Sequence, residues 1–143
     1  LAYDLLITPR HLPAACELVK KFPIQRFIID HIAKPEIKQG LLAPWAEGMR
    51  RLSRFPNAAC KLSGMITEAD WQAWQPGDFD PYLEHVLDCF GPERLMFGSD
   101  WPVCLLAGSY TQVQRLASRT IDRLSPAEQA QIWGETARRF YQL

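Results

Sequence analysis

The chain has 143 residues, of which 48% are hydrophobic and 22% charged, so it has enough apolar side chains for a folded core and is not a disordered segment. Its 16 basic and 16 acidic residues give a formal net charge of zero, which offers no electrostatic reason to expect nucleic acid or an anionic membrane as a partner. The sequence has no run of 18 apolar residues and no signal-peptide pattern, and we therefore expect a cytoplasmic protein.

Four rounds of strand followed by helix are predicted in chain order. The predicted strands are residues 3–7, 27–32, 58–62 and 95–98. The helices that follow them are residues 12–22, 44–55, 81–89 and 110–124. This alternation indicates an α/β fold with a parallel sheet, either a doubly wound open sheet or part of a (β/α)₈ barrel. A complete barrel needs about 250 residues, so this chain would supply about half of one.

The two ends of the chain each carry a sequence pattern that predicts local structure. The chain begins at Leu1 without an initiator Met and already within a predicted strand, and we expect it to be the later part of a longer protein. Near the other end, Ser125 and Glu128 form a capping box around Pro126. This pattern predicts a helix to about residue 133, ended by Gly134 and followed by a last short helix over residues 136–141.

The four cysteines are scattered, with no C-x-x-C pair and no histidine at zinc-ligand spacing. We expect them to be buried thiols that pack as small apolar side chains. A secreted disulfide framework is the alternative.

Two segments, residues 26–35 and 94–103, are built alike: an apolar run ends in polar residues and a proline. In parallel α/β folds the functional groups gather where the strands end, and His31 and Asp100 lie there. Asp100, beside a bulky Trp101, is suited to proton transfer or metal ligation, or it caps a turn. His31 could ligate a metal or polarise a carbonyl, or it is a structural histidine.

Other polar residues near these strand ends have a structural alternative. Asp30 precedes His31 in the predicted strand, so we expect it to point to the opposite face and to be structural. Lys61 and Ser63 are two residues apart and share one face of the third strand. Lys61 either neutralises a carboxylate inside the fold or reaches a substrate. Trp71 lies in a loop long enough to shape a pocket.

Three segments together resemble one known family. They are Asp30-His-Ile-Ala-Lys-Pro35, Cys60-Lys-Leu-Ser-Gly64 and Phe97-Gly-Ser-Asp-Trp-Pro102. In this order and separation they resemble the C-terminal half of the amidohydrolase-related TIM-barrel hydrolases, which include sugar lactone hydrolases and a pyrone dicarboxylate lactonase. The resemblance covers essentially the whole chain. It implies a single partial domain over residues 1–143, with its four strands matching strands five to eight of the barrel.

The resemblance also implies a site and a reaction. His31 matches the family's sixth-strand histidine and Asp100 its eighth-strand aspartate, which would act as general base on the water that opens a sugar-acid lactone. Lys61, Trp101 and Trp71 would bind the substrate. One divalent metal, zinc or manganese, would be held by His31 and Asp100, or the enzyme would be metal-independent.

One part of the family pattern is missing. Relatives carry a His-x-His pair on the first strand, and this chain contains no His-x-His. The resemblance therefore implies that half of the active site lies outside the chain and that the chain alone has little or no turnover. Two alternatives are a non-catalytic half-barrel, which associates with itself or with a missing N-terminal half, and a metal-dependent decarboxylase on the same scaffold.

Overall fold

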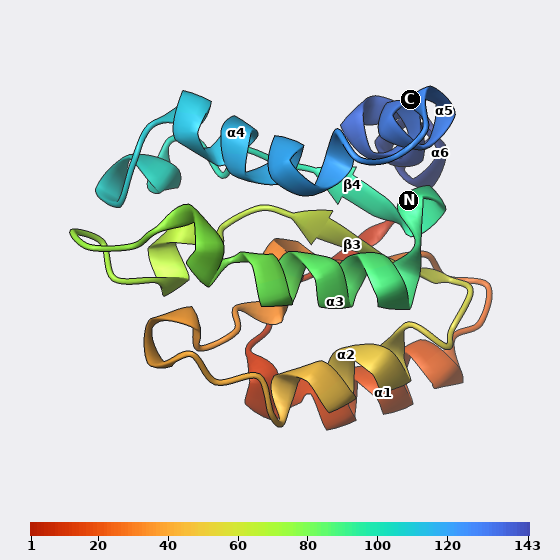
Figure 1. Ribbon diagram of the computed structural model, residues 1–143. Coiled ribbons are helices and arrows are strands. Elements are labelled where there is room, and N and C mark those ends of the chain that lie inside the picture. The colour runs from red at the N-terminus through yellow and green to blue at the C-terminus, as the bar shows by residue number, and fades with distance from the viewer.

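The computed structural model describes residues 1–143 and is built on a parallel sheet (Figure 1). The strands are β1 (Tyr3–Leu5), β2 (Phe27–Ile29), β3 (Ala58–Leu62) and β4 (Leu95–Phe97). They lie side by side in the order β1-β2-β3-β4. A doubly wound sheet reverses its strand order at a switch point, whereas successive units of a barrel keep chain order. The fold is therefore α/β and matches half of a (β/α)₈ barrel.

One long helix follows each strand. These helices are α1 (Leu12–Lys21), α2 (Trp45–Leu52), α3 (Asp80–Phe90) and α4 (Tyr110–Ile121). All four contribute side chains to one apolar cluster on the same face of the sheet, in front of the strands in Figure 1. No helix has both the length and the apolar character needed to cross a membrane. The predicted elements are thus all present, with boundaries shifted by up to three residues.

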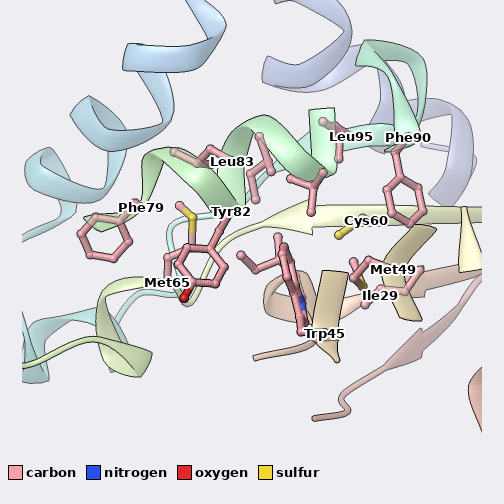
Figure 2. Packing of buried hydrophobic residues seen from close by; sticks show 14 of the residues in the cluster. Ile29, Trp45, Met49, Cys60, Met65, Phe79, Tyr82, Leu83, Phe90 and Leu95 are labelled. Carbon is pink, nitrogen blue, oxygen red and sulfur yellow. The ribbon is translucent and has the colours of Figure 1, made fainter. Parts of the chain in front are cut away.

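The main core lies between the sheet and these helices (Figure 2). Strand residues such as Ile29 and Cys60 meet Trp45 and Met49 of α2 and Leu83 of α3. Burying one such aliphatic or aromatic side chain stabilises the fold by roughly 1.5–3 kcal/mol. This layer fixes the positions of the strands and hence of the loops that follow them.

The other face of the sheet has a smaller apolar cluster. Ile28, Ala59 and Met96 project from three adjacent strands, and Phe140 packs against them. Phe140 belongs to α6 (Thr136–Tyr141), the last helix of the chain. The C-terminal helix therefore covers part of the face that would line the interior of a closed barrel.

The C-terminal helices differ from the prediction at Gly134. The capping box at Ser125 starts α5 (Pro126–Ala130) as predicted, but a π-helical turn over Gln131–Glu135 then leads directly into α6. Gly134 costs a helix about 1 kcal/mol relative to Ala without forbidding it. Packing of Trp133 on Phe97, with ring centroids 4.8 Å apart, holds this turn in place.

All four cysteines are free thiols. Cys16, Cys60 and Cys104 are buried, as predicted, and Cys89 is half-buried. Burial raises the pKa of the Cys60 thiol well above its ordinary value. The cysteines therefore act as packing groups rather than as thiolates.

Candidate active site

The backbone turns sharply where β2 ends, and this turn carries His31. The prediction extended the strand to residue 32, but β2 stops at Ile29 and a tight turn follows over Asp30–Ala33. His31, Ile32, Ala33 and Lys34 have φ values of 52°, 46°, 59° and 49°. Residues other than glycine adopt this left-handed conformation only when the surroundings hold them there, and such strain is concentrated at functional sites.

Two contacts hold this turn. The indole Nε1 of Trp45, which is 1% exposed, donates a hydrogen bond of 2.6 Å to the Ile32 carbonyl. Lys34 forms an ion pair with Glu68 from the loop after β3. Lys34 is thus part of the support of the turn.

The turn also changes which face His31 reaches. Asp30 and His31 were predicted to point to opposite faces, and this prediction is wrong. Asp30 contacts Lys61, and His31 contacts Ser63. Lys61 and Ser63 lie two residues apart on one face of β3 and its continuation, so Asp30 and His31 reach the same face. The alternation fails because His31 no longer has strand dihedrals.

His31 and Asp100 face one another across the ends of β2 and β4. His31 Nε2 lies 3.6 Å from Asp100 Oδ1, and the two side chains are 20% and 13% exposed. This separation is too long for a direct hydrogen bond, so both groups can contact one atom placed between them. The juxtaposition that the strand-end pattern predicted is present.

Asp100 is itself in an unusual conformation. Its φ is 56°, and its carboxylate caps no helix or turn. The next residue, Trp101, is 65% exposed. A carboxylate with no backbone partner, next to an exposed indole, can still accept a proton or bind a ligand.

Lys61 lies deeper, between two carboxylates. Its Nζ is 2.7 Å from Asp30 Oδ1 and 2.8 Å from Asp4 Oδ2, and Tyr141 of α6 donates a hydrogen bond to Asp4. Burial of the ammonium acts to lower the pKa of Lys61, but the hydrogen bonds with Asp30 and Asp4 outweigh it and raise the pKa above its ordinary value. The ion pair, one of the two alternatives for Lys61, is therefore formed.

Trp71 lies apart from this pair of residues. It is 50% exposed, in the loop between β3 and α3, and its Nε1 donates to the Thr67 carbonyl. It lines two surface cavities of about 590 and 520 Å³, whose walls include neither His31 nor Asp100. The structure does not bring Trp71 to the same cavity as the His31–Asp100 pair.

Comparison with known proteins identifies the family of the chain. The profile of the Amidohydrolase family matches residues 1–143. The chain belongs to this amidohydrolase family. An L-fucono-1,5-lactonase from Burkholderia multivorans is 42% identical over 151 residues, covering 99% of this chain and 51% of the relative. The chain thus spans about half the length of the curated relatives it matches.

Solved structures of amidohydrolases share the fold. A crystal structure of an amidohydrolase from Burkholderia multivorans with bound zinc has 42% identity and a TM-score of 0.92, covering 99% of this chain and 52% of that one. A putative 2-pyrone-4,6-dicarboxylic acid hydrolase from Pseudomonas putida has 22% identity and a TM-score of 0.78, covering 99% of this chain and 51% of that one. At this lower identity the similarity concerns the fold alone.

The metal donors of this amidohydrolase chain are few. No three side chains among His, Cys, Asp and Glu are grouped as a metal site. The imidazole of His31 and the carboxylate of Asp100 are donor types that zinc accepts. Zinc usually takes about four ligands, so this pair fits part of a coordination sphere and does not complete one.

Sequence reasoning missed the residues that support the site. It placed Ser63 on the correct face but assigned it no role, and it gave none to Gly64 or Trp45. Gly64 has φ +61°, and a Cβ there would lie 2.6 Å from the His31 ring. A glycine directly after the polar end of a strand was the signal that could have indicated this close approach.

Proposed function

We propose that the complete protein carrying this chain is a lactonase that opens the ring of a sugar-acid lactone of the L-fucono-1,5-lactone class. The observation that carries this proposal is the facing of His31 and Asp100 at 3.6 Å across the ends of two parallel strands. The 42% identity to an L-fucono-1,5-lactonase supports the substrate class. The 143 residues would be a single, partial barrel domain.

In the proposed reaction Asp100 is the general base. Its carboxylate takes a proton from the water whose oxygen attacks the lactone carbonyl carbon. The tetrahedral intermediate then collapses, the bond from this carbon to the ring oxygen breaks, and Asp100 returns the proton to the departing oxygen. The product is the open-chain hydroxy acid, and Asp100 is restored as a carboxylate.

His31 would act on the carbonyl oxygen. Negative charge develops on this oxygen as water attacks, and a donor placed beforehand stabilises that charge without reorganisation. The turn over Asp30–Ala33 holds the ring with Nε2 toward Asp100. His31 would then contact the carbonyl oxygen of the substrate, and Asp100 would contact the water that attacks the same carbonyl group.

Substrate binding would involve Trp101, Lys61 and Trp71. The exposed Trp101 offers an aromatic face beside Asp100. The Lys61 ammonium already meets Asp4, Asp30 and Tyr141, so it would contact a substrate oxygen by exchanging one of these partners. Trp71 would contact the substrate only by movement of its loop, because it lines separate cavities in this structure.

A divalent metal is the alternative to the N–H donor, because Nε2 of His31 cannot both carry a proton and ligate a metal. His31 and Asp100 would hold it, with further ligands from outside these 143 residues. When bound, the metal would supply Lewis-acid polarisation of the carbonyl. The zinc in the related amidohydrolase structure supports zinc as the first metal to test.

The other half of a barrel is the proposed partner of this chain. β1 and β4 are the edges of the sheet, and a barrel of this type closes with eight strands. Exposed apolar side chains at the β1 end, Leu1, Tyr3 and Leu6, support contact with further chain. We propose that activity needs this second half and that the chain alone does not turn over substrate.

The test is a lactone assay with the complete protein. We expect hydrolysis of L-fucono-1,5-lactone, and a loss of about 10²–10⁴-fold in kcat for Asp100→Asn. Asp122→Asn, at an exposed helix end, is the matched control and keeps full activity. Full activity of Asp100→Asn rejects the general base. Repeating the assay after chelation and zinc return decides whether a metal takes part.

A further inference from the structure

Ser63 makes one side-chain hydrogen bond, and it is to His31. The Ser63 side chain lies directly after β3 and is buried, with the residue 2% exposed. Its Oγ lies 2.8 Å from Nδ1 of His31, and no other hydrogen-bond partner is present for this hydroxyl. Because Ser63 is buried, water does not readily accept a hydrogen bond from its hydroxyl. A hydroxyl proton without a protein acceptor would therefore be unfavourable.

Two glycines make this contact sterically feasible. A Cβ on Gly64 would lie 2.6 Å from Cγ and Nδ1 of His31. A Cβ on Gly98 would lie 3.1 Å from Cβ of Ser63. The His31 ring is therefore packed between Ser63 and the Gly64 backbone, and its free nitrogen, Nε2, points toward Asp100.

The direction of the hydrogen bond follows from counting donors and acceptors. A neutral imidazole has one N–H donor and one acceptor nitrogen. If Nδ1 carried the proton, the Ser63 hydroxyl would accept it and its own proton would have no acceptor. If Nδ1 is the acceptor, the hydroxyl donates to it and both groups are satisfied. The second arrangement puts the ring proton on Nε2, which faces the Asp100 carboxylate.

We propose that Ser63 is the positioning residue of His31: its hydroxyl donates to Nδ1 and so fixes the ring with an N–H at Nε2. This inference deepens the proposed lactonase function and rests on it. Nε2–H is then the donor that meets the carbonyl oxygen, while the facing Asp100 takes the proton of water. The hydrogen bond at Nδ1 fixes both the tautomer and the orientation of the ring.

Ser63 is not a nucleophile in this arrangement. A serine nucleophile must be exposed to the substrate carbonyl and must pass its proton to the histidine. Ser63 is buried, and the ring nitrogen without a hydrogen-bond partner is Nε2, which faces Asp100. The contact of Ser63 with His31, and the facing of His31 and Asp100, therefore orient a hydrogen-bond donor, the Nε2–H of His31.

The first test is the tautomer of His31 in the complete, chelator-treated protein. Two-bond ¹H–¹⁵N spectra of ¹⁵N-histidine-labelled protein at about pH 8, where an ordinary histidine is neutral, distinguish Nε2–H from Nδ1–H, and His31→Gln assigns the signal. We expect Nε2–H in the wild type and a tautomer mixture in Ser63→Ala. Ser53→Ala removes another buried hydroxyl, which donates to the Arg50 carbonyl at the end of its own helix, and leaves the His31 signal unchanged.

The second test is kinetic. We expect Ser63→Ala to lower kcat about 10–100-fold with KM within about 2-fold, because the substrate still binds while the donor is misdirected. A wild-type spectrum with the proton on Nδ1, the tautomer that would ligate a metal through Nε2, overturns the proposal. So does a Ser63→Ala protein with both the wild-type spectrum and the wild-type kcat. If the wild type does not hydrolyse lactones, the proposed function is rejected. The spectra then still decide whether Ser63 fixes the tautomer of His31.

Discussion

The ammonium of Lys61 lies 2.7 Å from the carboxylate of Asp30, the residue directly before His31. Asp4 contacts the same ammonium from β1, so one cation joins three neighbouring strands. Removing one partner from such a group leaves the others as partly buried charges without compensation. This relationship makes Lys61 part of the support of the site, whether or not it also contacts substrate.

Lys61→Met is expected to lower the free energy of unfolding by about 1–3 kcal/mol, because Asp30 and Asp4 lose their cation. Urea denaturation measures this. Lys38→Met, which breaks an exposed pair with Asp70, is the control and changes the free energy by less than about 0.5 kcal/mol. Equal effects of the two substitutions would contradict the role of Lys61.

The Lys61 contribution has a defined pH dependence. The pKa of Lys61 is raised in the folded state, so its stabilisation is complete below the ordinary lysine value of 10.5 and is lost as pH rises through the folded-state pKa. The stability difference between wild type and Lys61→Met is therefore expected to be constant from about pH 6 to pH 9 and to shrink above about pH 10.5. Denaturation at several pH values tests this, and a difference that grows in alkali would refute it.

Gly64→Ala is expected to reduce both stability and activity. The new Cβ would meet the His31 ring at 2.6 Å, and alanine at φ +61° is itself strained. The strain costs about 1–3 kcal/mol in unfolding free energy, and the displaced ring lowers kcat. Gly77→Ala, with nothing within 4 Å of the added Cβ, shifts stability by less than about 1 kcal/mol. Thermal melts and lactone kinetics on both proteins make the comparison.

Trp45→Phe removes the donor that holds the left-handed turn. The Ile32 carbonyl then lacks its partner in a buried site, and we expect a loss of about 1–3 kcal/mol. Because His31 lies in the same turn, kcat is expected to fall with stability. Trp101→Phe, at an exposed position, serves as the control for stability alone. An unchanged melting temperature in Trp45→Phe would show that the indole hydrogen bond does not stabilise the turn.

Trp101→Ala tests substrate binding. The exposed indole beside Asp100 offers an apolar face to a sugar ring, so its removal is expected to raise KM by about 10-fold, equivalent to about 1.4 kcal/mol. kcat is expected to change much less, because Asp100 and His31 remain. Ile24→Ala, at an exposed position before β2, is the matched control with unchanged kinetics. An equal loss in kcat and kcat/KM would instead assign Trp101 to the transition state.

Much of the architecture followed from the sequence because its signals are local. The apolar runs at residues 58–62 and 95–98 predicted strands that the structure contains as β3 and β4, with one residue less in β4. The capping box at Ser125 predicted the start of α5. Gly134 misled the prediction, because a lone glycine signals a helix end only when tertiary packing does not hold the helix through it. Here Trp133 docks on Phe97 and the chain stays helical.

The sequence by itself determined the βα order, the apolar core, the family resemblance and the presence of a histidine and an aspartate at strand ends. Only the tertiary structure decided where those side chains point. The backbone from His31 to Lys34 is left-handed because Trp45 and Glu68, from other elements, hold it there, and no local propensity favours that conformation. The 3.6 Å approach of His31 to Asp100 and the contact with Ser63 depend on this turn, so they emerge only once distant segments have packed together.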